Sequence, residues 1–296
     1  MYKGFYGFFE EPFNVTSDPE FFFPSHRHEE AFSHLVYGIQ QRKGILVITG
    51  EIGTGKTTIC RTLLSRLTHN IKTALVLNPY FSELQLLQFI VKDLGIPGNF
   101  RSKLALITTL NNFLIEQATL GNNVVLIIDE AQNLKTNQLE QVRLLSNLET
   151  EKEKLLQIIL VGQPELVEKL RLPALRQLTQ RVAVRYHILP LDRKDVSRYI
   201  DHRIKVACRL PQGVDIPQDQ LPVRFTDRAV EAIYLHSQGT PRLINIICDR
   251  ALLLGYVNAT NVLDENIIFK SVREIGNTHE HHSRSPEKSS IGSLTE

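Results

Sequence analysis

The sequence lacks a strong charge of either sign and has few cysteines. Its 296 residues carry a formal net charge of +2, so a broad basic surface for nucleic acid is not indicated, although a local basic patch remains open. The three cysteines, Cys60, Cys208 and Cys248, are widely separated and form no C-x-x-C pair. This pattern favours neither a disulfide framework nor a zinc site, and we expect a cytoplasmic protein with small buried thiols.

Long apolar runs are also missing. No run approaches the roughly 20 residues that a membrane-spanning helix needs, and the best are short, such as "VVLII" at 124–128. The aromatic N-terminus, "MYKGFYGFFEEPFNV", is interrupted by Glu10, Glu11 and Pro12, so it has no continuous apolar region of the kind found in a signal peptide. We therefore expect neither a membrane span nor a cleaved leader, and we find no internal repeats.

Five short apolar segments predict a parallel sheet. They are "ILVIT" (45–49), "TALVL" (73–77), "VVLII" (124–128), "QIILV" (157–161) and "VAVRYHI" (182–188). Four of them lack polar alternation, as expected for strands that helices cover on both faces. Because helix-length segments separate the strands, the sequence predicts a doubly wound α/β domain over residues 28–190.

The rest of the chain divides into three parts. Residues 1–27 include seven phenylalanines, which a solvated tail would not tolerate, so we expect this segment to pack on the α/β core. Residues 191–275 show three amphipathic helical stretches, centred near Ile200, Ile233 and Cys248, and predict a small helical domain. Residues 276–296 are polar and rich in serine, which predicts a disordered tail with solvated histidines.

The segment "GEIGTGKTT" (50–58) matches the template G-x-x-x-x-G-K-[ST] at Gly50, Gly55, Lys56 and Thr57. In this template backbone N–H groups curl round a phosphate, the lysine reaches the β- and γ-phosphates, and the hydroxyl ligates Mg²⁺. The apolar segment before it and the helical segment after it favour this reading over a flexible turn. The candidate phosphate contacts within the segment are Gly50, Ile52, Gly53, Thr54, Gly55, Lys56, Thr57 and Thr58.

A second motif, "VVLIIDEAQN", places Asp129 and Glu130 directly after a predicted buried strand. Parallel strands bring such residues to the sheet edge that also carries the phosphate loop. Asp129 suits the shell of a Mg²⁺ ion together with Thr57, and Glu130 suits the orientation of an attacking water. Alone, the pair would be an ordinary strand end or helix cap. Together with the loop, it predicts a site that hydrolyses a nucleoside triphosphate with Mg²⁺.

Other polar residues lie where contacts to the γ-phosphate are expected. Gln163 and Asn78 each follow a predicted strand, and either could be a plain turn residue. Arg176 and Arg181 precede the last strand, where an arginine suits a clamp on the nucleotide of a neighbouring subunit; a surface salt bridge is the alternative.

Arg242 follows Thr240 and Pro241 at a helix start, where a cation opposes the helix dipole, so contact with phosphate is a candidate reason for its presence. Phe23 and His28 are candidates to approach the adenine base, with simple packing as the alternative.

Taken together, these motifs resemble an AAA+ ATPase. More narrowly, three segments resemble the ATPases of the general secretion pathway protein A (ExeA/GspA-like) family: "FYGFFEEPFNVTSDPEFFFPSHRHEEAFSHLVYGI" (5–39), "RLLSNLETEKEKLLQIILVGQPEL" (143–166) and "SQGTPRLINIICDRALLLGYV" (237–257). The likeness covers about residues 1 to 275. Secretion members of this group continue into a transmembrane helix and a periplasmic domain, whereas this sequence ends in a polar tail.

The resemblance assigns roles to the candidate residues. Lys56 and Thr57 become Walker A, and Asp129 and Glu130 become Walker B. Gln163 becomes sensor 1, Arg242 sensor 2, Arg181 the arginine finger, and Asn78 the switch residue that restrains Glu130. The helical domain becomes the lid of an AAA+ protein.

The resemblance also implies ATP binding, a homo-oligomer that forms with ATP, and an envelope or secretion-system partner. The expected function is an oligomeric motor or switch for secretion, pilus or extracellular polymer export, located in the cytoplasm or recruited by a partner to the inner face of the cytoplasmic membrane. Two other readings stay open: a DNA-associated regulator similar to transposition-target ATPases, which the near-neutral charge does not favour, and a nucleotide-gated scaffold with little turnover.

Overall fold

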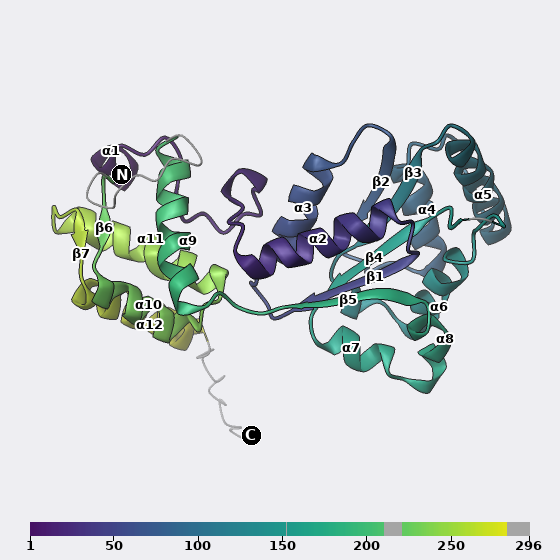
Figure 1. Cartoon of the computed structure of the whole chain (residues 1–296). Helices are drawn as coiled ribbons and strands as arrows, with labels where there is room; N and C mark the ends of the chain where they lie inside the picture. The colour runs from purple at the N-terminus through teal and green to yellow at the C-terminus, as the bar shows by residue number, and fades with distance from the viewer. Residues whose placement is uncertain (152, 210–220, 283–296) are drawn as a thin grey trace, which may run out of the picture. The chain divides into compact units, whose positions relative to one another are not determined.

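The protein forms two compact units in a computed structural model that describes residues 1–151, 153–209 and 221–282. Thr16–Leu191 together with Thr240–Arg242 make up the α/β unit, and Met1–Val15, Asp192–Gly239 and the chain from Leu243 onward make up the helical unit (Figure 1). The two units are described separately below.

Five parallel strands form the sheet of the α/β unit: β1 (Ile45–Gly50), β2 (Ile71–Val76), β3 (Asn123–Ile128), β4 (Gln157–Gly162) and β5 (Val182–Ile188). Their order in the sheet is β2-β3-β4-β1-β5, and every neighbouring pair is parallel. The five predicted strands and the predicted fold class are therefore confirmed. Because all carboxyl ends lie at one edge, the loops after β1, β3 and β4 start there together.

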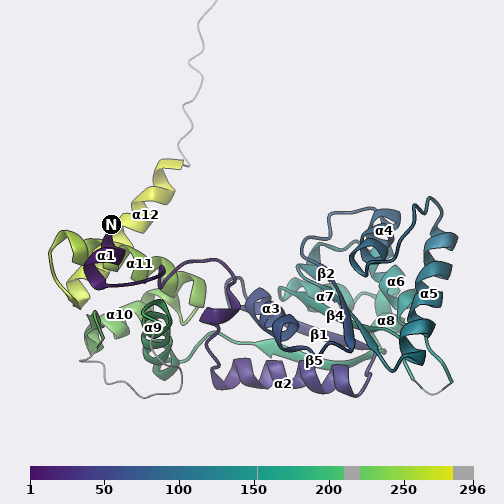
Figure 2. The same cartoon turned by 90° about the horizontal axis from the view of Figure 1, so that it is seen from above.

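Helices cover both faces of this sheet. They are α2 (His26–Gln40), α3 (Lys56–Arg66), α4 (Glu83–Asp93), α5 (Lys103–Thr119), α6 (Thr136–Leu145), α7 (Glu165–Leu170) and α8 (Arg176–Thr179), with short 3-10 turns η1 (Pro19–Phe21), η2 (Ala131–Asn133) and η3 (Pro173–Leu175). Figure 2 shows α2 and α3 on one side of the sheet and α4, α5 and α6 on the other.

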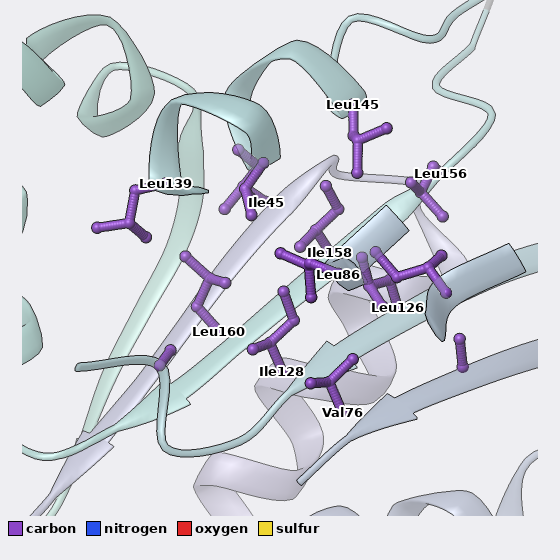
Figure 3. Close-up of a cluster of buried hydrophobic side chains, with 14 of the residues drawn as sticks. Ile45, Val76, Leu86, Leu126, Ile128, Leu139, Leu145, Leu156, Ile158 and Leu160 are labelled. Carbon is purple, nitrogen blue, oxygen red and sulfur yellow. The ribbon is translucent and has the colours of Figure 1, made fainter. Parts of the chain in front are cut away.

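Alternate residues of β1, β2, β3 and β4 enter different cores, and both cores are apolar. Leu126, Ile128 and Ile158 pack with Leu86 of α4 and Leu139 of α6 on one face (Figure 3). On the other face, Val125, Ile127 and Ile159 pack with residues of α2 and α3 such as Leu35 and Ile59. Burial on both faces explains why these strands are apolar at successive positions.

The helical unit contains α1 (Tyr2–Tyr6), α9 (Arg193–Ala207), α10 (Asp227–Ser237), α11 (Pro241–Val257, of which residues up to Arg242 group with the α/β unit) and α12 (Glu265–His282). A two-stranded parallel sheet joins β6 (Arg224–Phe225) and β7 (Val262–Leu263). The helices α9, α10 and α11 occupy the three amphipathic stretches found in the sequence. The strands β6 and β7 are too short to leave a pattern that the sequence analysis could detect.

The N-terminal segment packs differently from the sequence-based expectation. Residues 1–15 belong to the helical unit, and only the chain from Thr16 onward belongs to the α/β unit. Phe13 is almost fully buried and its ring meets that of Phe225 edge to face, with ring centroids 6.2 Å apart. The prediction that the whole of 1–27 packs on the α/β core is wrong for residues 1–15. The phenylalanine-rich composition correctly indicated that side chains of this segment are buried, but it did not indicate which core buries them.

The C-terminal boundary also differs from the expectation. Helix α12 runs to His282, so residues 276–282, which we expected to be disordered, are helical. The rest of the predicted tail, 283–296, lies outside the described residues. Among the described residues, no helix combines the length and apolar character needed to cross a membrane.

Candidate nucleotide-binding site

The loop between β1 and α3 has the backbone of a phosphate cradle. Gly53 and Gly55 adopt φ angles of +81° and +91°, which side-chain-bearing residues rarely adopt. A Cβ atom on Gly50 would lie 2.7 Å from the carbonyl oxygen of Ile188, so the close approach of the loop to β5 requires glycine there. Thr54 is fully buried, and its hydroxyl donates to the Glu51 carbonyl at 2.8 Å. Ile52 is 60% exposed and Thr58 half-buried.

Lys56 opens α3 and is almost fully buried beside two acids. Its Nζ atom donates to the carbonyl oxygens of Gly50 and Glu51, both at 2.8 Å. Burial lowers the pKa of Lys56 below its ordinary value, and the carboxylates of Glu130 and Asp129 oppose this shift. An anion placed beside this ammonium group would stabilise its charged form, which is what a phosphate-binding lysine needs.

Thr57 and Asp129 form a direct pair between α3 and the end of β3. The Thr57 hydroxyl donates to Oδ2 of Asp129 at 2.5 Å, and the Glu130 N–H donates to Oδ1 at 2.9 Å. Burial raises the pKa of Asp129, while these two hydrogen bonds oppose the rise. The structure thus brings the two predicted Mg²⁺ ligands together. Hydroxyl and carboxylate oxygens are the donors that Mg²⁺ prefers, and it usually takes only one or two carboxylates beside phosphate and water.

Glu130 follows Asp129 with a left-handed backbone, φ 52°. Such a conformation is uncommon for a residue with a side chain and is a form of strain that occurs at functional sites. Its Oε2 atom accepts hydrogen bonds from the side-chain amides of Gln132 at 2.5 Å and of Gln163 at 3.3 Å. The structure therefore joins the ends of β3 and β4 through the Glu130 carboxylate, with the predicted Gln163 as one of its two partners.

Gln132 is a site residue that the sequence analysis did not identify. Besides its bond to Glu130, its Oε1 atom accepts the backbone N–H of Gln163 at 3.1 Å. A Cβ atom on Gly162 would lie 2.7 Å from this Oε1 atom, so a glycine at the end of β4 makes room for the amide. Lys169 of α7 donates to the Gln132 carbonyl at 2.5 Å and so fixes the η2 turn from the other side. The only signal was the position of Gln132 in "DEAQN", two residues after Glu130.

Three predicted residues do not reach this cluster. Asn78 follows β2 as expected but is exposed, and within the described part of the chain no hydrogen bond links its side chain to Glu130. Arg181 is exposed and donates to Oδ1 of Asn147, and Arg176 is exposed at the start of α8. The predicted roles of Asn78 as a switch residue and of Arg181 as a clamp therefore stay predictions.

Arg242 lies near the loop through its backbone. Its N–H donates to the Gly53 carbonyl at 3.2 Å, and a Cβ atom on Gly53 would lie 2.7 Å from Cβ of Arg242. The side chain itself is exposed. His28, which the sequence analysis considered for adenine, instead directs a ring nitrogen at the Thr54 carbonyl, 2.9 Å away.

A protein-family model for the AAA domain matches residues 39–170. This stretch includes β1, the loop, Lys56, Thr57 and both acids after β3. The match confirms the predicted resemblance to AAA+ ATPases.

A named relative matches most of the chain. General secretion pathway protein A of Aeromonas hydrophila is 41% identical over 277 residues, which cover 93% of this chain and 48% of that protein. The chain therefore resembles general secretion pathway protein A as predicted, and it spans about half the length of this relative.

Two solved structures share the fold at much lower identity. Cdc6p from Pyrobaculum aerophilum superposes with a TM-score of 0.62 at 18% identity, covering 87% of this chain and 71% of that one. The Aeropyrum pernix ORC2 protein (ADPNP–ADP complexes) gives a TM-score of 0.58 at 16% identity, covering 88% of this chain and 70% of that one. At these identities the likeness concerns the fold alone.

Proposed function

We propose that this chain binds ATP with Mg²⁺ and hydrolyses it, as the ATPase part of an oligomeric motor or switch in secretion, pilus or extracellular polymer export. The observation that carries the proposal is the meeting of Lys56, the Thr57–Asp129 pair and the Glu130–Gln163 pair at one edge of the sheet. Each group matches one need of phosphoryl transfer to water: charge neutralisation, ligation of a divalent cation and orientation of the attacking water.

The phosphates of ATP would lie against the start of α3. Backbone N–H groups between Gly50 and Lys56 and the dipole of α3 favour an anion at this place. Lys56 would exchange its carbonyl partners for the β- and γ-phosphates. Bound Mg²⁺ would neutralise part of the phosphate charge, and Thr57 and Asp129 are the residues that would hold it.

Glu130 would orient and polarise the attacking water. Its carboxylate keeps a second oxygen, Oε1, that neither Gln132 nor Gln163 contacts in the hydrogen bonds of the described site. That oxygen can accept a hydrogen bond from water, while the two amides hold the other oxygen in place. Gln163 would in addition donate to the γ-phosphate as sensor 1, with Asn78 restraining Glu130 when nucleotide is bound.

The metal requirement gives the direct test of this site. Phosphate release from ATP by the purified full chain should require Mg²⁺ and stop with EDTA. Thr57→Val and Asp129→Asn should each lower turnover by about 100-fold, because each removes a metal-ligating oxygen. Thr119→Val, an exposed hydroxyl on α5, serves as the matched control. A parent protein without Mg²⁺-dependent turnover would contradict the enzymatic part of the proposal.

Two arginines extend the proposal to an oligomer and to the lid. Arg181 is exposed on the α/β unit, where it could reach the nucleotide of a second copy, and Arg242 would contact phosphate as sensor 2. If Arg181 acts across a subunit boundary, mixing Arg181→Ala protein with Lys56→Ala protein should restore part of the lost activity. Failure to recover activity at any ratio would count against a shared site.

The link to secretion rests on the relative of known name. Because that protein is a general secretion pathway protein and shares 41% identity, we propose a partner in an envelope or secretion machine. Recruitment by this partner would place the chain at the inner face of the cytoplasmic membrane. Proteins that co-purify with the Glu130→Gln variant in ATP, and not with Lys56→Ala, test this; recovery of the same proteins with both variants would argue against an ATP-dependent partner.

A further inference from the structure

The first turn of α2 contacts the phosphate loop through His28. The side chain is 5% exposed, and its Nε2 atom lies 2.9 Å from the carbonyl oxygen of Thr54. Its Nδ1 atom lies 2.6 Å from the hydroxyl oxygen of Ser25, which is fully buried and caps α2. His28 therefore bridges a helix cap and the loop that would hold the phosphates.

The partners of the ring define where its proton lies. A carbonyl oxygen only accepts hydrogen bonds, so Nε2 must carry the hydrogen that points at Thr54. The Ser25 oxygen also accepts the backbone N–H of His28, at 3.4 Å. Its own hydrogen is then available to donate to Nδ1, which accepts in the neutral ring. A neutral His28 protonated on Nε2 satisfies this whole arrangement.

The contact with Thr54 also affects the next residue. The Thr54 carbonyl belongs to the same peptide group as the Gly55 N–H, which is one of the amides that the loop offers to a phosphate. A hydrogen bond to the carbonyl polarises this peptide group and makes its N–H a stronger donor. The ring can approach closely because residue 55 is glycine: a Cβ atom there would lie 3.2 Å from Nε2 of His28.

We propose that His28 is a positioning residue for nucleotide binding: held by Ser25 in the Nε2–H form, it fixes and polarises the Thr54–Gly55 peptide for contact with phosphate. This inference rests on the proposed ATP site. It assigns the ring nitrogens a role at the phosphates rather than at the adenine base.

Three variants of His28 separate the hydrogen bond from packing. The ring also meets Phe22 edge to face, with centroids 6.1 Å apart. His28→Phe keeps a ring of similar size for this contact but has no donor. His28→Gln places a side-chain N–H near the position of Nε2, with an oxygen that can accept from Ser25. His28→Asn has the same chemistry but is too short to reach Thr54.

We expect affinity for ADP and ATP to fall by about fivefold to twentyfold in His28→Phe and in His28→Asn, the range that one lost hydrogen bond produces. His28→Gln should stay within about threefold of the parent, since it keeps the bond. Ser25→Ala should weaken binding more than Ser82→Ala, which removes the equivalent cap of α4 away from the loop. Parental affinity in His28→Phe, or a loss in His28→Gln equal to that in His28→Phe, would overturn the proposal; parental affinity in His28→Phe together with a loss in His28→Gln would favour ring stacking on the base.

The tautomer is measurable without nucleotide. In the full chain labelled with ¹⁵N-histidine, long-range ¹H–¹⁵N spectra distinguish the two ring nitrogens, and His28 is the one of the ten histidines whose signals vanish in His28→Gln. We expect the hydrogen on Nε2; a neutral ring with its hydrogen on Nδ1 would refute the proposal even if a variant fails to fold. If instead the parent binds no ATP, the proposed function fails while the spectrum still reports the geometry.

Discussion

The α/β unit and the helical unit reach a buried core by different routes. The sheet of the α/β unit is buried by helices that lie close to its strands in the sequence, between residues 26 and 179. The helical unit instead includes residues 1–15, whose buried side chains Tyr6, Phe8 and Phe13 belong with helices that follow almost 200 residues later. Arg203 of α9 shows this, because it donates to the carbonyl oxygens of Pro12 at 2.5 Å and Asn14 at 2.8 Å.

Because of this difference, the residues of the candidate site and the contacts that stabilise the helical unit lie in different parts of the chain. The candidate site depends on short connections that all start at one edge of the sheet. The helical unit depends on a few long-range contacts, such as those of Arg203 and of Tyr6, whose hydroxyl donates to the Thr260 carbonyl at 3.0 Å. Changes at the site should therefore affect turnover and leave folding intact, whereas changes at the N-terminal contacts should do the opposite.

The largest expected effect on turnover comes from Glu130→Gln. The amide keeps the size of the side chain but cannot polarise water as a carboxylate does, so we expect kcat to fall by about 100-fold or more. ATP binding and the unfolding temperature should stay close to those of the parent. Steady-state phosphate release measures the fall in kcat, and a thermal melt measures the unfolding temperature. Glu116→Gln, at an exposed position, is the control. Turnover at the parental rate would show that Glu130 does not orient the water.

Arg203→Met tests the other side of the comparison. The change leaves the carbonyl oxygen of buried Pro12 without the Arg203 donor and removes one of the donors to the Asn14 carbonyl, so we expect a loss of about 2–4 kcal/mol in the free energy of unfolding. Hydrogen exchange should become faster in residues 1–15 in particular. Arg198→Met, on an exposed face of the same helix, should change stability by less than about 1 kcal/mol. Equal effects of the two variants would argue against the N-terminal contact as a main source of stability.

Gln132→Ala is expected to act on turnover in a milder way. It removes one of the two amides that hold Glu130, so we expect kcat to fall by about fivefold to tenfold with little change in KM. Gln132→Glu should be worse, because two carboxylates would then repel each other. Asn133→Ala in the same turn is the control. A rise in KM without a change in kcat would place Gln132 in substrate binding instead.

The smallest expected effect concerns pH. Burial raises the pKa of Tyr6 to about 12 from an ordinary value of 10.0. Because the unfolded chain loses this proton first, the contribution of Tyr6 to stability is complete below pH 10 and is lost as pH rises toward 12. Tyr6→Phe should flatten this alkaline decline in denaturant midpoints measured between pH 9 and 11. An unchanged slope would mean that Tyr6 titrates normally.

The local sequence pattern predicted most of the α/β unit. It also indicated the lysine and the two acidic residues of the candidate site. Four of the five strands are apolar at successive positions, and the loop from Gly50 to Thr57 has a spacing that few other structures require. Lys56, Asp129 and Glu130 therefore follow from short stretches of sequence. Parallel strands then bring their ends together, which is why the end of β4, with Gln163, lies beside Glu130.

Contacts that depend on side-chain direction or on distant segments could not be predicted in this way. Gln132 reaches Glu130 because the backbone is left-handed at Glu130, a conformation that the sequence pattern does not predict. The partner of the N-terminal phenylalanines is decided by packing over nearly 200 residues, for which apolar composition gives no direction. The sequence analysis considered His28 for the adenine base. Its contact with Thr54 could not be predicted, because this contact depends on the angle at which α2 passes the loop.

Calorimetric titration of the full chain with Mg²⁺ and a non-hydrolysable ATP analogue tests the central claim most directly. The account predicts saturable binding at one site per chain to the parent and to Glu130→Gln, and none to Lys56→Ala of unchanged unfolding temperature. Equal binding by Lys56→Ala, or no binding by the folded parent, would contradict it.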